Sequence, residues 1–369
     1  MKASIITILD NTNFGTYLQA LALGRSVEKL GYEVEIIKYI RYLLTPWGRF
    51  TTLIKERGII RAIYRMLKSI RKMTVLRNKN YKFLCDFLPV TREYNSIKEL
   101  NTDVPDADVY ITGSDQVWNS VYNRGIDYCY YLDFVPKGKK CISYAASIGM
   151  DYFPEEQVIE IQKLLRRYDA ITVREKKSVA LLNTIGIKSH VVLDPTLLLD
   201  RSEWKSIAGR YAMPDYEPYL LVYSVETKKQ KQLIEHYAKI IAKEKHLKIY
   251  EISYGGKIGH MEFADRSFLS ATPDQFLNLM LHASFVIISS FHGTAFAINF
   301  NKQFITISPN RFNSRVENIL EITGLADRMV SDTQTDILNL KKINYMIVNK
   351  IISEERINSM GILKNILKN

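Results

Sequence analysis

Short runs of apolar and β-branched residues recur along this chain, and a stretch of helical periodicity follows most of them. The first unit is clear: residues 3–8 form an apolar run, 17–30 carry apolar residues at helical spacing, Gly31 would end that helix, and 33–40 form the next run. Consecutive strands joined through a helix lie parallel, and parallel sheets are covered by helices. The pattern therefore predicts an α/β fold with parallel sheets flanked by helices.

A length of 369 residues is sufficient for two such domains. Residues 201–218 are polar, contain two prolines and predict an irregular linker between two sets of strands. We expect an N-terminal Rossmann-like domain over 1–205, a second Rossmann-like domain over 215–345, and a C-terminal helix over 346–369 that could pack back on the first domain. We expect the two Rossmann-like domains to face a cleft.

The cysteines and the N-terminus indicate a cytoplasmic protein. Cys85, Cys129 and Cys141 form no CxxC motif and are odd in number, which argues against a disulfide framework or a structural zinc site. The first apolar run is too short for a signal peptide, and no apolar stretch is long enough to span a bilayer.

One basic block carries the whole charge imbalance. Residues 38–82 contain thirteen basic residues and a single acid, Glu56, and their net charge of +12 equals that of the chain. Within the block, 51–72 has a helical pattern with a basic face and an apolar face. This favours contact with an anionic membrane surface, and the alternative is a helix docked on the protein with a solvated basic face. No nucleic-acid motif accompanies the charge, so no nucleic-acid partner is expected.

The stretch SSFHGT at 289–294 predicts an anion site, because it joins a strand to a helix where α/β folds bind ligands. We expect Ser290, Gly293 and Thr294 to contact substrate, with Gly293 letting the backbone approach an anion. Helix N–H groups would receive a phosphate or carboxylate, and His292 could add a charge or a proton. The alternative is a histidine that is hydrogen-bonded within a turn.

Two arginines are candidates for binding the same anion. Arg174 follows the predicted strand 170–173, and its guanidinium suits carboxylate or phosphate; the alternative is an ion pair with Glu175. Arg315 opens a predicted helix at 313–323 and could supply a second cation, or be an ordinary helix charge.

The loop GSDQVWN at 113–119 has the residue types of a sugar site. Asp115 could act as general base toward a sugar hydroxyl, or it could be a capping residue in a turn. Gln116 could hydrogen-bond to the sugar, and Trp118 could stack on its ring. Asn13, in the first strand–helix loop, is a further candidate at the same kind of position.

Five motifs occur in one order, and together they resemble the polysaccharide pyruvyltransferase family over about residues 1–330. They are GSDQVWN at 113–119, YAASIG at 144–149, VREKKS at 173–178, DPTLLL at 194–199 and SSFHGTAFAI at 289–298. The resemblance implies a GT-B-like fold of two domains and an enzyme that moves pyruvate from phosphoenolpyruvate onto a sugar as a ketal. The implied acceptor is a lipid-linked oligosaccharide.

The resemblance also implies residue roles. His292 matches the donor-site histidine of the family, and Arg174 matches an arginine that holds the donor. The family often has a further arginine two positions before that histidine, where this chain has Ser290. Arg315 or Lys302 could replace that charge.

Two alternatives remain open. One is a nucleotide-sugar-dependent GT-B-like glycosyltransferase, and the other is a membrane-associated assembly factor without activity. The sequence contains no GxGxxG, P-loop or HExxH motif, and we expect neither a metal nor a cofactor other than phosphoenolpyruvate as co-substrate.

Overall fold

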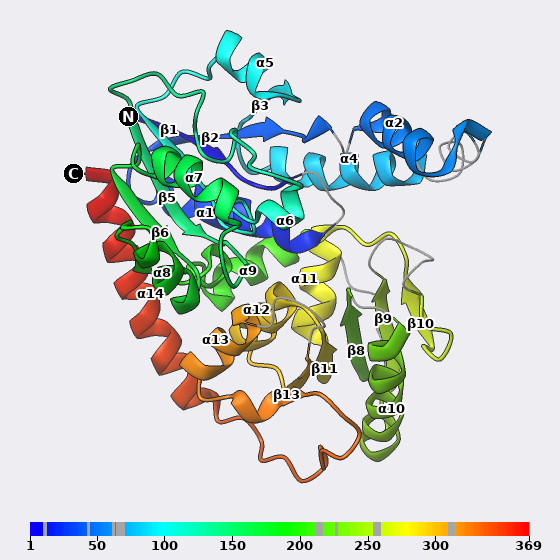
Figure 1. Cartoon of the computed structure of the whole chain (residues 1–369). Coiled ribbons are helices and arrows are strands. Elements are labelled where there is room, and N and C mark those ends of the chain that lie inside the picture. Colours follow the sequence, from blue (N-terminus) through cyan, green and yellow to red (C-terminus); the bar gives the residue numbers. More distant parts are fainter. Residues whose placement is uncertain are drawn as a thin grey trace. The chain divides into compact units, whose positions relative to one another are not determined.

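The chain forms two compact units, Met1–Leu198 with Asn358–Asn369 (unit 1) and Leu199–Ile357 (unit 2), each described here by itself. Figure 1 shows the computed structural model of the whole chain. The structure describes residues 1–9, 13–42, 45–60, 63, 71–211, 217–225, 228–253, 260–308 and 314–368.

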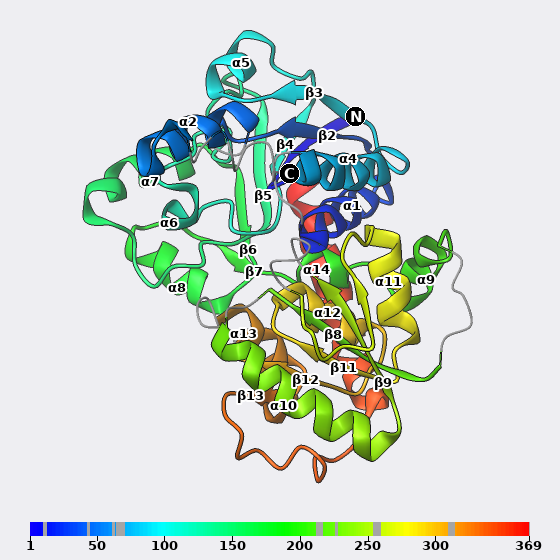
Figure 2. The same cartoon turned by 90° about the vertical axis from the view of Figure 1, so that its right-hand side faces the viewer.

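Unit 1 is built on a parallel sheet. Within the described residues, the strands lie in the order β3-β2-β1-β4-β5-β6-β7, and β1, β2, β4 and β5 can be followed side by side in Figure 2. The strands are β1 (Lys2–Ile6), β2 (Glu33–Tyr39), β3 (Val90–Tyr94), β4 (Val109–Thr112), β5 (Lys140–Ala146), β6 (Ala170–Val173) and β7 (His190–Val191). Because every pairing is parallel, all the carboxyl ends lie at one edge.

The helices of unit 1 alternate with these strands. They are α1 (Phe14–Glu28), α2 (Pro46–Arg57), α4 (Arg71–Cys85), α5 (Ile97–Thr102), α6 (Ser120–Asn123), α7 (Val158–Leu165) and α8 (Lys176–Thr184). Helix α1 is buried over almost its whole length and begins at Asn13, whose side chain caps it by accepting a hydrogen bond from Gly15 N. Gly31, at φ 90°, lets the chain turn after this helix into β2.

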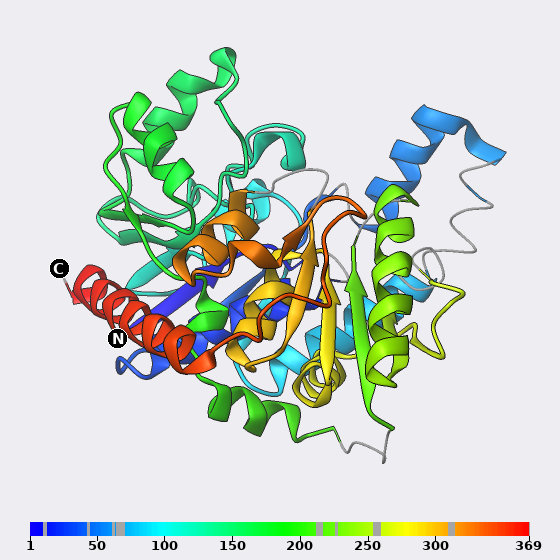
Figure 3. The same cartoon turned by 90° about the horizontal axis from the view of Figure 1, so that it is seen from below.

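Unit 2 repeats the same architecture. Its described strands lie in the order β10-β9-β8-β11-β12-β13, again all parallel, and α10 and α12 lie on opposite sides of the sheet (Figure 3). The strands are β8 (Tyr219–Ser224), β9 (Lys248–Ser253), β10 (Arg266–Phe268), β11 (Phe285–Ile288), β12 (Phe304–Ile307) and β13 (Met329–Val330). The helices are α9 (Arg201–Ala208), α10 (Lys228–Lys245), α11 (Pro273–His282), α12 (Phe291–Asn299), α13 (Ser314–Ile322) and the first part of α14 (Tyr345–Lys368). From Asn358 onward, α14 belongs to unit 1.

The prediction of an irregular linker over 201–218 is wrong for the first part of this segment, because helix α9 forms there. Asp200 caps this helix in a reciprocal capping box with Glu203, and Trp204 is fully buried with its ring against Phe296. The polar composition of the segment belongs to the exposed face of an amphipathic helix. Residues 212–216 lie outside the described residues.

Only part of the basic block at 38–82 is described. Arg61, Arg65 and Lys68 of the expected basic face lie outside the described residues, so that face stays a prediction. The described part includes α2, capped by Thr45, and exposed apolar side chains at Trp47, Ile59, Ile60 and Ile63. Among the described helices, none is long and apolar enough to cross a bilayer.

Candidate functional site

Both sheets have the strand order of a Rossmann fold, which reverses direction at one point. In unit 1 this point lies between β1 and β4, and in unit 2 it lies between β8 and β11. In open α/β sheets, ligands bind outside the carboxyl ends of the strands at this switch point. The loop after β4 begins at Gly113 and the loop after β11 begins at Ser289, so two of the predicted stretches occupy the switch points.

Arg174 is the centre of a buried polar cluster at the carboxyl edge of unit 1. It follows β6, and its Nη1 donates to Oδ2 of Asp194 at 2.7 Å and to Ser114 Oγ at 3.3 Å. Its Nε donates to Oε1 of Glu175 at 3.3 Å, and its Nη2 lies 3.9 Å from Oδ1 of Asp115. The structure therefore brings the predicted residues Arg174 and Asp115 together.

The positive charge of Arg174 is more than compensated inside the protein, because three carboxyl groups surround it. Burial alone would lower the pKa of Arg174, but the nearby carboxyl groups of Asp194, Glu175 and Asp115 outweigh burial, so the pKa lies above its ordinary value. A buried guanidinium that already faces three carboxyl groups is poorly placed to neutralise a further anion. This placement argues against the expected donor contact and for a role in positioning Asp115.

Asp115 has an unusual backbone that the cluster holds in place. Its φ is 78°, in the left-handed region, which aspartate tolerates better than most residues. Its backbone carbonyl accepts hydrogen bonds from Val117 N and Ser147 N, and its Oδ1 accepts one from Gln116 N at 2.9 Å. The carboxyl group is thereby fixed at the carboxyl edge of β4.

Trp118 does not have the expected role, because its side chain is 1% exposed. The indole Nε1 donates to Tyr130 O, and the ring stacks on Tyr131 at 5.7 Å between centroids. A buried ring cannot stack on a sugar, so Trp118 is a core residue that anchors the loop. Gln116 is buried as well, and its Oε1 accepts from Asn119 Nδ2 at 3.3 Å.

Asn13 lies at the carboxyl edge of β1, as expected, but its described contact is structural. The side chain caps α1 through Gly15 N at 3.0 Å. The same β1–α1 connection reaches the loop after β4, because Thr7 Oγ1 donates to Ser114 O at 2.6 Å. A substrate contact by Asn13 stays a prediction.

In unit 2, the predicted anion site forms the start of α12. Ser290 is the N-cap, and its Oγ accepts from Gly293 N at 3.2 Å. His292 lies in the first turn and is 5% exposed, with its ring edge-on to that of Phe291. The helix dipole favours an anion at this end. Ser290, in place of the arginine that the family often has, caps the helix and adds no charge.

Gly293 and Thr294 are explained by packing. A Cβ on Gly293 would lie 2.4 Å from Ile288 Cγ2 and 3.1 Å from the Tyr223 ring, so the glycine lets α12 approach the sheet. Thr294 is fully buried, and its hydroxyl donates to Ser290 O at 3.0 Å and lies 3.3 Å from the hydroxyl oxygen of Thr306. The expected substrate contact of Thr294 is therefore corrected to a contact between α12 and β12.

Lys302 and Arg315 were the two residues expected to replace the charge of the arginine that is absent at Ser290. They lie at opposite edges of the unit 2 sheet. Lys302 precedes β12, and its ammonium donates to the carbonyl of Ala283, which precedes β11, at 2.9 Å. It thus lies at the amino edge, about a strand length of 13 Å from Ser290, and cannot replace the missing charge. Arg315 lies in the first turn of α13, which follows β12, and remains a candidate at the carboxyl edge.

Sequence reasoning gave Glu175 as a possible partner of Arg174, which the structure confirms, and missed Asp194. Asp194 is fully buried and accepts from Ser114 Oγ and Thr196 as well as from Arg174, and Glu175 accepts from Ser147 Oγ at 2.7 Å. The available signal was the position of Asp194 directly after the apolar run 191–193 and before Pro195. Among the described residues, no group of three histidine, cysteine, aspartate or glutamate side chains is placed to hold a metal ion.

Comparison with solved structures defines the fold class as GT-B. MnaA of S. aureus, solved with UDP, has a TM-score of 0.54 at 10% identity, over 98% of this chain and 90% of that chain. A UDP-GlcNAc 2-epimerase from Neisseria meningitidis bound to UDP-GlcNAc has a TM-score of 0.52 at 10% identity, over 100% of both chains. Trehalose-6-phosphate synthase OtsA has a TM-score of 0.53 at 9% identity, over 100% of this chain and 99% of that one.

These likenesses confirm the predicted fold class, two α/β domains with parallel sheets of the GT-B kind, and at such identities they show the fold alone. No curated protein matches this chain in sequence. The family is nevertheless clear: the polysaccharide pyruvyl transferase family matches residues 13–311, and the chain belongs to it. The resemblance seen in the five motifs is thereby confirmed.

Proposed function

We propose that this polysaccharide pyruvyl transferase takes pyruvate from phosphoenolpyruvate and forms a pyruvate ketal on a sugar. The observation that carries the proposal is the first turn of α12, where Ser290 and His292 follow β11 at the switch point of unit 2. A helix start at this position suits a ligand that carries both phosphate and carboxylate. Unit 2 would therefore bind the donor.

His292 is the proposed catalytic group of the donor side. In its protonated form it would stabilise the phosphate as it leaves, and a positioned acid of this kind contributes about 10²–10⁴-fold in rate. Two sugar hydroxyls replace the phosphate on the same carbon. They lose two protons, of which one ends on the methylene carbon of the donor and one on the phosphate.

Unit 1 would bind the acceptor sugar, with Asp115 as base. Its carboxyl group lies at the carboxyl edge of β4 and is held by Arg174 and the backbone of Gln116. The acceptor we propose is a lipid-linked oligosaccharide, because the chain belongs to a polysaccharide-modifying family and has a surface suited to a membrane.

That surface is the described part of the basic block. Trp47 is 66% exposed and Ile60 is 81% exposed, in a segment whose charge is almost entirely positive. Exposed apolar and aromatic side chains among cations favour an anionic lipid interface. Ile60→Ser should reduce flotation with anionic vesicles, whereas Ile159→Ser, at an equally exposed isoleucine on α7, should not. An equal loss of flotation in both variants would contradict the proposed membrane contact.

A nucleotide-sugar-dependent glycosyltransferase is the second candidate. Ser290 favours it, because this position lacks the arginine that would match phosphoenolpyruvate, and a helix start also suits a diphosphate. MnaA was solved with UDP and the Neisseria epimerase with UDP-GlcNAc, which makes uridine nucleotides the appropriate probes.

Thermal unfolding with each ligand separates the two candidates. At about 100 times its Kd, a ligand raises the free energy of unfolding by about 2.7 kcal/mol. We expect millimolar phosphoenolpyruvate to raise the melting temperature of the parent and not that of His292→Ala. Stabilisation by UDP-GlcNAc, without any by phosphoenolpyruvate, would favour the second candidate.

A further inference from the structure

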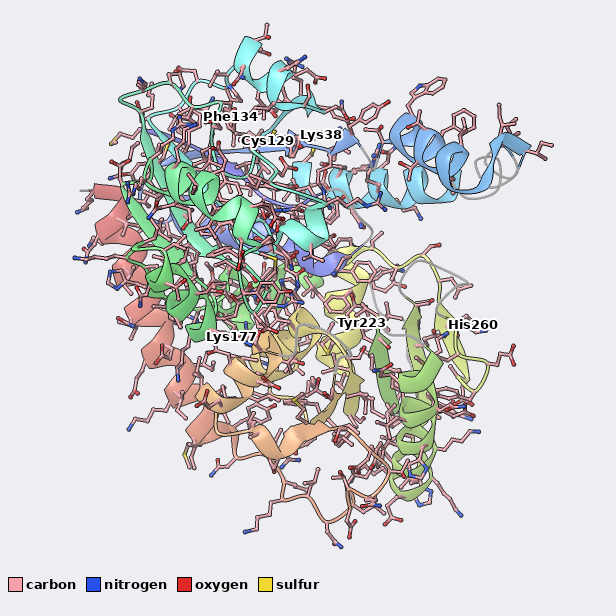
Figure 4. All side chains as sticks on the ribbon, in the orientation of Figure 1. Lys38, Cys129, Phe134, Lys177, Tyr223 and His260 are labelled. Carbon is pink, nitrogen blue, oxygen red and sulfur yellow. The ribbon has the colours of Figure 1, made fainter. Side chains whose placement is uncertain are left out.

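The proposed function leaves one proton without a donor, the proton that must be added to the methylene carbon of phosphoenolpyruvate. A second pair of titratable side chains lies on the sheet that carries the α12 start. Glu251, on β9, is 2% exposed, and its Oε2 lies 3.0 Å from Nδ1 of His260. His260 is 38% exposed and lies beside β9 and β10, where Figure 4 labels it.

The surroundings of Glu251 fix the imidazole in one orientation. Oε2 of Glu251 also accepts hydrogen bonds from Met261 N at 3.0 Å and from Ser267 Oγ at 2.9 Å. Oε1 of Glu251 is buried and has no hydrogen-bond partner among the described residues. With Nδ1 of His260 bound to this carboxyl group, the free position for a proton transfer is Nε2, on the other side of the ring.

The pair lies at the same edge of the sheet as the start of α12. Glu251 is two residues from the carboxyl end of β9, and the strand order places β8 alone between β9 and β11. Two strand spacings amount to about 10 Å. Ser253, Ser224 and Ser289 follow one another across the ends of β9, β8 and β11, and Ser289 Oγ donates to Ser224 Oγ at 2.9 Å. A row of serine side chains thus lies along this edge of the unit 2 sheet, between the Glu251–His260 pair and the start of α12.

We propose that His260, held by Glu251, is the general acid that protonates the methylene carbon of phosphoenolpyruvate, an inference that rests on the proposed function. The Nε2–H bond breaks, and the electron pair of the donor's carbon–carbon double bond forms the new C–H bond. The neighbouring carbon becomes cationic and takes the sugar hydroxyl, whose proton passes to water. The imidazole is left neutral, with its remaining proton on Nδ1 toward Glu251.

Two charged groups lie next to His260. Oε2 of Glu251, from β9, lies 3.0 Å from its Nδ1, and Nζ of Lys231, from α10, lies 3.4 Å from its backbone oxygen. Ser267 of β10 contacts Glu251 and carries no charge. Replacing Glu251 by glutamine removes the carboxyl group that orients the imidazole, so proton transfer from Nε2 should slow while binding of the donor is kept.

The test measures phosphate release from phosphoenolpyruvate, with a membrane extract as acceptor, across the neutral pH range. His260→Gln should lower kcat by about 10²-fold or more and leave KM for phosphoenolpyruvate nearly unchanged. Glu251→Gln should also lower kcat, by less than His260→Gln does, and should leave KM for phosphoenolpyruvate nearly unchanged. The matched control is His282→Gln, because Nδ1 of His282 bonds the backbone of Asn278 at the other edge of the same sheet.

The outcomes separate this inference from the function on which it rests. If the parent releases phosphate and His260→Gln does so equally well, the inference alone is overturned. A raised KM with an unchanged kcat would make His260 a binding contact and would also overturn it. A parent that releases no phosphate from phosphoenolpyruvate would overturn both. If Glu251→Gln fails to fold, His260→Gln still decides, because that side chain is partly exposed and its folding can be checked by circular dichroism.

Discussion

Arg174 and Asp194 form a buried ion pair that joins the end of β6 to the 3-10 helix Pro195–Leu197. The Nη1 to Oδ2 distance is 2.7 Å, and the two side chains are 2% and 0% exposed. Glu175 and Asp115 complete the set of carboxyl groups around the guanidinium. The carboxyl group proposed as acceptor base is therefore held by a largely buried network of charged side chains.

Breaking this pair should destabilise unit 1 strongly. Asp194→Ala leaves a buried guanidinium with less compensation, and the expected loss is about 3–5 kcal/mol in the free energy of unfolding. Urea unfolding measures it. The control is Lys239→Ala, which removes an exposed ion pair with Glu235 on α10 and should cost no more than about 0.5 kcal/mol. Similar small losses in both variants would contradict a structural role for the buried pair.

Gly293→Ala should destabilise unit 2 by about 1–3 kcal/mol, because the added methyl group would lie 2.4 Å from Ile288 Cγ2. Gly361→Ala is the matched control, since it lies within α14 and its added methyl group meets no atom within 4 Å. That change should stabilise the protein by up to about 1 kcal/mol. Chemical unfolding of both variants measures the two changes in the free energy of unfolding, which should have opposite signs. If Gly293→Ala left the free energy of unfolding unchanged, the glycine would not be needed for packing.

Lys302 should make the stability of unit 2 depend on pH under alkaline conditions. Burial, with a contribution from the charge of Arg201, lowers the pKa of Lys302 to about 8, below its value of about 10.4 in an unfolded chain. The unfolded state then binds more protons between these two values, so stability should rise as the pH increases from about 8 to about 10. Lys302→Met should flatten this rise and increase stability at neutral pH. Parallel pH profiles of parent and variant would contradict the prediction.

The fold could be predicted because it depends on local patterns. The apolar run at 3–8, the helical periodicity after it and Gly31 each reflect a local preference that the parallel sheet then uses. Helix α9 was missed although its signal was present, since Asp200 and Glu203 have the spacing of a capping box. The polar composition of this segment is typical of a linker, and Trp204, which is buried in the structure, was the residue that indicated a packed helix.

The site was only partly predictable, because its contacts join distant parts of the chain. The loop of Asp115 and the strand end at Arg174 could be read from the sequence, but their meeting depends on β4, β5 and β6 being neighbours. Asp194 is 20 residues from Arg174, and no local pattern indicates that the two pair. Trp118 is buried by Tyr131 and Tyr168, which its own polar loop does not reveal.

The most direct test of the account is the release of inorganic phosphate from phosphoenolpyruvate in the presence of lipid-linked oligosaccharides, comparing the parent with His292→Ala. The account predicts acceptor-dependent release by the parent, together with a pyruvate ketal on the oligosaccharide, and a rate at least about 10²-fold lower for His292→Ala. Release at the parental rate by His292→Ala, or sugar transfer from a nucleotide sugar in place of phosphate release, would contradict it.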